Sequence, residues 1–132
     1  MDPDFAHLFQ RLGEMPKNDG WLDGEGVATT PRAILTLRLA AERLIGSGLM
    51  ADTYIYPRPC GGCQAEWDLG GVGFELRVLN AGDVCELDVY DRRGTRQGNA
   101  RFEDECLAFD PRNVTALDEA IGKAAGLIRV YR

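Results

Sequence analysis

The residues of this chain best suited to chemistry are four cysteines, two of which form a Cys-x-x-Cys motif. Two glycines separate Cys60 from Cys63, and Cys85 and Cys106 follow further along the chain. Four thiolates can hold a structural zinc ion, and Cys-x-x-Cys is half of the usual ligand set. The other two cysteines are far apart in the sequence, so a second close pair is missing. Zinc is therefore the alternative expectation, and the first expectation is that the protein needs no cofactor.

The residues around two of these cysteines point to positions in a hydrophobic core. Cys63 falls in the same strand register as Trp67, and Cys85 in the same register as Leu87, with polar residues in between. This alternation is typical of a strand with one buried side, and small buried thiols are common in cores. The motif also lacks a following helix that would lower a thiol pKa for redox chemistry. The pattern favours core and turn cysteines over a zinc site or a redox pair.

Other groups for nucleophilic catalysis are scarce. The chain has a single histidine, His7, in a predicted N-terminal helix, and a single serine, Ser47, in a Gly-Ser-Gly segment that ends a helix. A nucleophile needs a base beside it, and no glycine-rich phosphate-binding motif is present. The sequence therefore predicts a protein that is not an enzyme.

The spacing of apolar residues predicts three helices and an antiparallel sheet. Helical spacing covers residues 2–13, a second helix starts at Pro31 with Thr30 as its N-cap, and a third begins near Asn113. The third helix is expected to place an apolar stripe on one face, formed by Val114, Leu117, Ile121, Ala125 and Ile128. Alternating segments separated by Gly and Asn turns follow the second helix. The expected strands cover residues 52–57, 63–69, 72–79, 84–90 and 99–109. We predict an α+β fold in the order α-α-β-β-β-β-α, with a four- or five-stranded meander and helices on one face.

Length and composition indicate one small domain. The 132 residues are 45% hydrophobic and 27% charged, which is typical of a globular chain. We expect residues 1–132 to form a single domain, with residues 1–20 as an N-terminal helix and mobile arm. No apolar run is long enough to cross a membrane, and the N-terminal residues do not resemble a secretion signal. The expected location is the cytoplasm.

The negative charge of the chain is concentrated in its middle third. The formal net charge is −6, and residues 64–110 alone hold eleven Asp and Glu against five Arg. Strand register places Glu66, Asp68, Glu75, Glu86 and Asp88 on the outward side of the sheet. This charge disfavours nucleic acid and anionic membranes as direct partners.

Two interpretations of the acidic strands remain open. In one, they form a docking surface for a basic protein, extended by Glu103, Asp104 and Glu105, with Trp21 in a glycine-rich loop as a further contact. In the other, they are the solvated face that an antiparallel sheet normally has. A homodimer that pairs through an exposed strand edge is also compatible with the sequence.

Three segments resemble a group of small uncharacterised bacterial and phage proteins. The segments are the loop Trp21-Leu22-Asp23-Gly24-Glu25-Gly26, the helix started by Pro31, and the strand Gly61-Gly62-Cys63-Gln64-Ala65-Glu66-Trp67. Such proteins look like accessories found near mobile elements or toxin–antitoxin genes. The resemblance implies that Cys60 and Cys63 are local substitutions in a hairpin, where relatives often have Asp and an apolar residue.

These observations predict a small acidic regulator or inhibitor that works by binding another protein. The resemblance to phage and mobile-element proteins implies an antitoxin, an immunity-type protein, or an anti-CRISPR or other anti-defence protein. We expect it to occlude a basic surface of its partner, such as one that binds nucleic acid. The competing hypothesis is a zinc-binding or thiol-dependent module built on the four cysteines.

Overall fold

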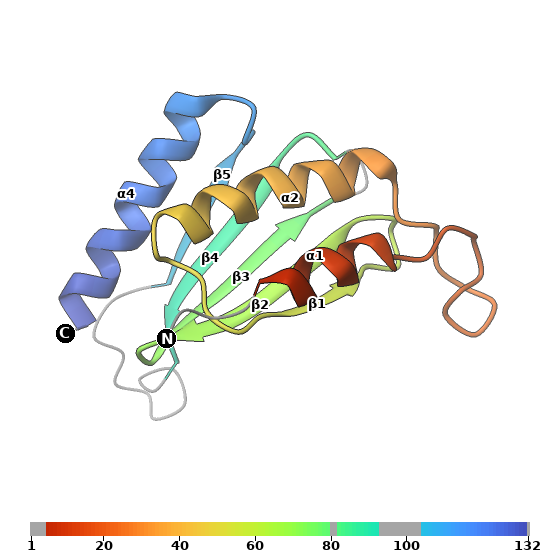
Figure 1. Cartoon of the computed structure of the whole chain (residues 1–132), viewed down its shortest axis with the longest axis horizontal. Coiled ribbons are helices and arrows are strands. Elements are labelled where there is room, and N and C mark those ends of the chain that lie inside the picture. Colours follow the sequence, from red (N-terminus) through yellow and green to blue (C-terminus); the bar gives the residue numbers. More distant parts are fainter. Residues whose placement is uncertain (1–4, 80–81, 93–103, 132) are drawn as a thin grey trace.

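The chain folds as a five-stranded antiparallel sheet with helices on one side. The computed structural model describes residues 5–79, 82–92 and 104–131. Every strand pairs with the next one in the chain, so the sheet is a meander (Figure 1). The strands are β1 (Tyr54–Pro57), β2 (Cys63–Leu69), β3 (Val72–Val78), β4 (Cys85–Asp91) and β5 (Glu105–Phe109). The helices are α1 (Ala6–Gly13), α2 (Pro31–Gly46) and α4 (Val114–Tyr131).

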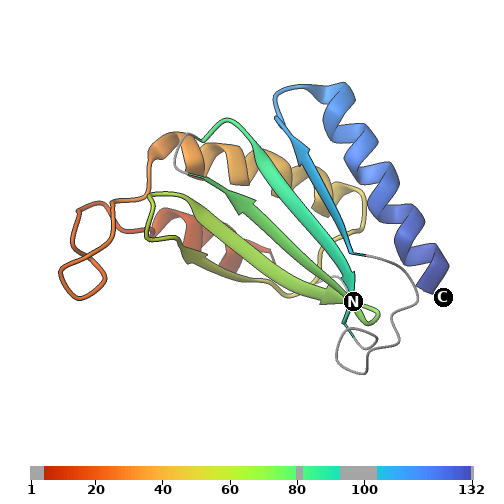
Figure 2. The same cartoon turned by 180° about the vertical axis from the view of Figure 1, so that it is seen from behind.

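The three helices of the described residues pack on the same face of the sheet. The first, α1, contacts β1, α2 contacts the three middle strands, and α4 contacts β4 and β5. Seen from behind, the strands lie in front of α1 and α2 (Figure 2). The predicted α+β meander with helices on one face is confirmed, and the fifth strand is present.

The second helix begins as its sequence predicts. The Thr30 side chain accepts a hydrogen bond of 3.1 Å from the Ala33 backbone N–H, and Pro31 occupies the first turn. Two buried thiols of the sheet lie directly under the helix. Cys63 donates to the Ala33 carbonyl at 3.6 Å, and Cys85 donates to the Thr36 carbonyl at 3.9 Å. The predicted core position of both cysteines is confirmed, since neither is exposed.

The inward side chains of the strands form a continuous core with the helices. Trp67 stacks on Phe74 of the neighbouring strand, with ring centroids 5.1 Å apart and planes 2° from parallel. The Trp67 indole N–H donates to the Leu49 carbonyl at 2.8 Å, so its polar group is satisfied despite burial. Trp67 is therefore a core residue, as its register predicts.

The sequence expectation for the buried side of the last helix needs correction. The last helix was expected to bury Val114, Leu117, Ile121, Ala125 and Ile128, but Val114 is 56% exposed and Ile121 and Ala125 are only half-buried. The buried stripe is instead Leu117, Ala120, Ala124 and Ile128, because the helix meets the sheet at its edge and turns its small residues inward.

The N-terminal segment contributes to the core. Leu8, Leu12 and Met15 are buried in the same hydrophobic cluster as the strands, so the helix expected within the mobile arm over residues 1–20 is packed against β1. His7 lies on the exposed side of this helix.

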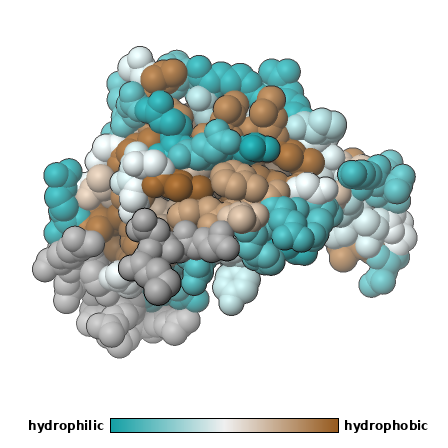
Figure 3. All heavy atoms as spheres, viewed as in Figure 1, coloured by the Kyte–Doolittle hydropathy of each residue, from teal (hydrophilic) through white to brown (hydrophobic). Residues whose placement is uncertain are grey.

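The helix-covered side presents both hydrophilic and hydrophobic residues, with hydrophobic ones visible between the helices (Figure 3). Leu35, on α2, is 50% exposed there. None of the helices in the described part of the chain combines the length and hydropathy needed to cross a lipid bilayer.

A matched pair of glycine substitutions tests the packing of the β1–β2 hairpin on β3. A methyl group at Gly62 would overlap the Val78 carbonyl oxygen, whereas one at Gly122 in α4 meets no atom within 4 Å. We expect Gly62→Ala to lower the free energy of unfolding by about 2–3 kcal/mol through overpacking. Gly122→Ala should raise it by about 1 kcal/mol through helix propensity. Urea unfolding measures both, and equal stability of Gly62→Ala and the unmodified chain would contradict this packing.

Candidate functional site

The uncovered side of the sheet gathers the polar residues that the sequence singled out. We call this surface the open face, and it consists of the outward side chains of the five strands. The paired residues form cross-strand rows, of which the central one runs Tyr54, Glu66, Glu75, Asp88 and Cys106. The next row runs Tyr56, Gln64, Arg77, Glu86 and Ala108, and the third runs Asp68, Gly73 and Tyr90. All five predicted carboxylates of the strands therefore lie on one surface.

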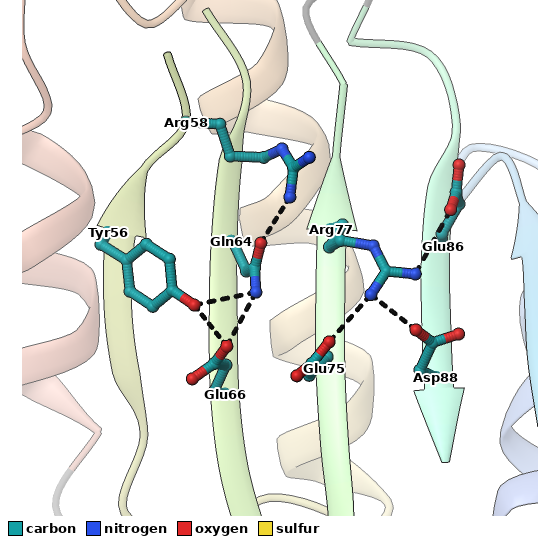
Figure 4. A network of polar contacts seen from close by, with 8 residues as sticks. All are labelled: Tyr56, Arg58, Gln64, Glu66, Glu75, Arg77, Glu86 and Asp88. Carbon is teal, nitrogen blue, oxygen red and sulfur yellow. Dashed lines mark hydrogen bonds and ion pairs between the residues drawn. The ribbon is translucent and has the colours of Figure 1, made fainter. Parts of the chain in front are cut away.

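The centre of the open face is a guanidinium group that the sequence analysis did not single out. Arg77 contacts Glu75 at 2.9 Å, Glu86 at 3.4 Å and Asp88 at 2.6 Å, and its side chain is only 17% exposed (Figure 4). The hydrogen bond to Asp88 is the main reason why the pKa of Arg77 rises above its ordinary value. The register that placed the carboxylates outward also places Arg77 outward, so the signal was present in the sequence.

The carboxylate of Asp88 is held ionised by its neighbours. Partial burial opposes its ionisation, but hydrogen bonds from Arg77 and Cys106 outweigh burial and lower the pKa of Asp88. The same hydrogen bond to Asp88 raises the pKa of the Cys106 thiol. Three of the predicted docking carboxylates are thus paired within the protein, which makes the open face less negative than its count of acidic residues suggests.

A second polar network connects β1 and β2. Tyr56 donates its hydroxyl hydrogen to Glu66, while the Gln64 amide donates to the Tyr56 oxygen at 2.9 Å and to Glu66 at 2.8 Å. Arg58 donates to the Gln64 carbonyl oxygen at 2.5 Å and completes the chain of contacts (Figure 4). Burial and the bond to Glu66 raise the pKa of Tyr56. These fixed donors and acceptors hold Glu66 in one position.

Two hollows of the open face are lined by described residues, and Tyr90 contributes to one of them. The Tyr90 ring lies over Gly73, where a methyl group would overlap the ring atoms. The hollow without Tyr90 measures about 470 Å³ and is lined by Ala51, Asp52, Tyr54, Glu66, Trp67, Asp68 and Arg92. Asp68 and Arg92 form an ion pair of 2.8 Å there.

The other hollow is strongly acidic, and we call it the acidic hollow. It measures about 450 Å³ and is lined by Glu75, Asp88, Tyr90, Asp104, Glu105 and Cys106. Asp104 and Glu105 are exposed and line this hollow, although Glu105 pairs with Val89 and so belongs to the helix-side register of β5. Glu103, the remaining member of the predicted surface, lies outside the described residues.

Trp21 does not join the open face. It lies in the loop between α1 and α2, which projects beyond the end of the sheet (Figure 1). Its indole N–H donates to the Val27 carbonyl at 2.8 Å, and Gly26 packs closely against its ring. The structure thus places this residue within its own loop, apart from the carboxylates with which the sequence grouped it.

The four cysteines are divided between different environments. Cys63 and Cys85 are buried on the helix side of the sheet, whereas Cys106 lies in the row of Asp88 on the open face. Cys60 is exposed in the β1–β2 turn, whose backbone bonds to the loop before α2 through Val27 and Thr30. Among the described residues, no three His, Cys, Asp or Glu side chains form a group able to hold a metal ion. The structure does not bring together the thiols of the alternative zinc site.

The thiols also differ in acidity. Burial raises the pKa of Cys63 and of Cys85 to about 12. Burial of Cys60 is slight and opposes ionisation, but hydrogen bonds from the Gly62 backbone and from Arg58 outweigh it and lower the pKa of Cys60. The Cys-x-x-Cys motif is therefore a hairpin turn with one accessible thiol and one core thiol.

Comparisons with known proteins add no assignment: no family model matches the chain, no curated protein matches it, and no solved structure matches it.

Replacement of Arg77 tests the central ion cluster. Arg77→Met leaves three carboxylates close together, and we expect a loss of about 2 kcal/mol of unfolding free energy at pH 7. This is less than for a fully buried pair because water screens the cluster. Arg92→Met, which removes the exposed pair with Asp68, should change stability little.

The stability lost in Arg77→Met should depend on pH because of Asp88. The pKa of Asp88 is lower in the folded protein than in the unfolded chain, so its contact with Arg77 stabilises the fold at pH values above the unfolded carboxyl pKa of roughly 4. That stability disappears as the pH falls through the folded pKa. Arg77→Met should therefore lose less stability than the unmodified chain on acidification from pH 6 to pH 2, measured by urea unfolding. Parallel pH curves for the two proteins would show that the pair does not hold Asp88 ionised.

Thiol labelling tests the placement of the cysteines. With iodoacetamide at pH 7.5, Cys60 should react first and Cys106 more slowly, because the thiolate is the reactive form. Cys63 and Cys85 should react only after unfolding, since both are buried. Peptide mass mapping over time measures each rate, and a chelator-treated sample serves as control. Protection of Cys60 and Cys106 that a chelator removes would instead support the zinc alternative.

Proposed function

We propose that this chain is a protein-binding regulator that inhibits a partner by covering a basic surface on it. The proposal rests on the open face, because the helices occupy the other side of the sheet and leave this one available. The observation that carries it is the acidic hollow, which Glu75, Asp88, Asp104 and Glu105 line together with Tyr90.

The charge of the whole surface supports a basic partner. The open face and its two hollows have eight carboxylates and three guanidinium groups among the described residues. The carboxylates belong to Asp52, Glu66, Asp68, Glu75, Glu86, Asp88, Asp104 and Glu105, and the guanidinium groups to Arg58, Arg77 and Arg92. Arg77 alone faces three carboxylates and Arg92 pairs with Asp68, so negative charge remains in excess on this surface. Among the described residues, Asp104 and Glu105 at the acidic hollow have no ion pair and contribute to this excess.

The shape and chemistry of the acidic hollow fit a lysine or arginine side chain. A cation there gains charge-assisted contacts with carboxylates and can also lie against the tyrosine ring. The fixed networks around Arg77 and Glu66 reduce the entropy that the surface loses on binding. Complementary charge also increases the rate of association with a basic protein and repels nucleic acid.

The biological role that we propose is that of a phage or mobile-element inhibitor. A protein that binds nucleic acid has a basic surface, and an acidic protein that covers this surface prevents binding. This role covers an antitoxin, an immunity protein and an anti-CRISPR or other anti-defence protein. The resemblance of the Trp21 loop, the Pro31 helix and the Gly61–Trp67 segment to small bacterial and phage proteins supports the same role.

A charge-reversal pair tests the proposal. Asp104→Lys with Glu105→Lys reverses the exposed part of the acidic hollow, where neither residue takes part in an ion pair that holds the fold. Glu25→Lys with Glu42→Lys makes the same charge change in the α1–α2 loop and on the helix side. A partner captured from host lysate is identified, purified and titrated against all three proteins. We expect at least a tenfold weaker affinity for the hollow variant only, and weaker binding of the unmodified chain at high salt.

The proposal fails if both variants bind the partner as the unmodified chain does. It also fails if the two reversals weaken binding equally, because the effect then reflects net charge rather than the acidic hollow.

A further inference from the structure

The two edges of the sheet differ in what they offer to another strand. At the β1 edge, Pro57 has no backbone N–H, and Arg11 of α1 donates to the Ile55 carbonyl at 3.4 Å. Both features hinder strand addition. The β5 edge has no proline within Glu105–Phe109, and β4 is its only neighbour among the described strands. No strand of the described part of the chain pairs with the outer backbone groups of β5.

A further hollow, separate from those of the open face, runs along the β5 edge on the helix side. We call it the edge hollow. It measures about 210 Å³ and is lined by four consecutive β5 residues, Cys106 to Phe109, together with one stripe of α4. That stripe is Ala116, Glu119, Ala120 and Lys123, at the spacing of one helix face. The alanines leave room between the helix and the strand, and α4 lies beside β5 in Figures 1 and 2.

The edge hollow and the acidic hollow meet at one residue. Cys106 lines both, and the two hollows lie on opposite sides of β5. Successive side chains of a strand point to opposite faces of its sheet. A strand added to β5 would thus direct alternate side chains into the acidic hollow and into the edge hollow.

From this arrangement we propose that the partner is bound as a sixth strand along β5, through an extended segment that alternates basic and aliphatic residues. The basic side chains enter the acidic hollow near Asp104 and Glu105, and the aliphatic ones pack on Ala116 and Ala120. Main-chain hydrogen bonds to β5 supply affinity, and the two hollows supply specificity, as in other cases of strand addition. The inference rests on the proposed function and names the chemistry of the partner segment.

A defined peptide tests the inference without knowledge of the natural partner. The probe is a fluorescent seven-residue peptide of alternating Lys and Val, and the control peptide groups the same residues into a Lys block and a Val block. Fluorescence anisotropy measures both affinities. We expect the alternating peptide to bind at least tenfold more tightly. Methylation of the backbone nitrogens along one side of the alternating peptide should remove binding, whereas methylation along the other side should not.

A pair of substitutions in α4 tests whether the peptide binds in the edge hollow. Ala116→Phe fills the edge hollow, and Ala125→Phe makes the same change on the same helix beside a different hollow, near Leu49 and Leu69. Circular dichroism confirms that each variant is folded. Ala116→Phe should weaken the affinity for the alternating peptide at least tenfold, and Ala125→Phe should leave that affinity unchanged. Equal binding of the two peptides, or no effect of Ala116→Phe on a folded protein, would overturn strand addition.

These outcomes separate the two proposals. Suppose that the Asp104 and Glu105 reversals abolish binding of the purified partner and that Ala116→Phe does not. The open face then binds the partner without an added strand. In that case the inhibitor proposal stands and the strand-addition inference is wrong.

Discussion

The packing of α2 against the three middle strands is the constraint on which the other features depend. Its buried face has small residues, Ala33, Ala40 and Ala41, so the helix lies close enough for the thiols of Cys63 and Cys85 to reach its carbonyl groups. Thr36, in the same face, donates to the Gly82 carbonyl and accepts from Arg112 at 2.8 Å. One buried hydroxyl thereby connects the helix, the β3–β4 turn and the segment before α4. The helices α1 and α4 pack on the same face, over the strands on either side of α2 (Figure 1).

That one-sided arrangement determines the character of the open face. Because no described helix covers it, its side chains must be polar, and because five strands are paired in register, those side chains form fixed rows. Arg77 and Gln64 occupy one row and organise the carboxylates around them. The face is therefore a structured surface with local pairing and an excess of negative charge, to which Asp104 and Glu105 contribute at the acidic hollow. A uniform acidic surface would steer a partner, but a patterned one can also orient it.

The fold could be predicted from the sequence because strands and helices each impose their own spacing on the apolar residues. Register alone placed Cys63 and Cys85 inside and Glu66 and Asp88 outside, and Thr30-Pro31 marked the start of α2. Residue order does not record which side chains lie opposite one another on neighbouring strands. The contacts of Arg77 and the meeting of two hollows at Cys106 were therefore not predicted. The buried stripe of α4 was also missed, because Ala120 and Ala124 have too little apolar surface to stand out in the sequence.

The protected β1 edge has a consequence for self-association. Fibres grow when the free edge of one molecule joins a different free edge of the next, so that each addition leaves a new site for another. Here the prolines near β1 and the Arg11 contact to Ile55 close one of the two edges. A dimer formed through the β5 edges of two copies would leave no further edge open to strand addition, so association would stop at two chains. With only one edge that can accept a strand, a sheet of this kind can pair once but cannot extend into a fibre.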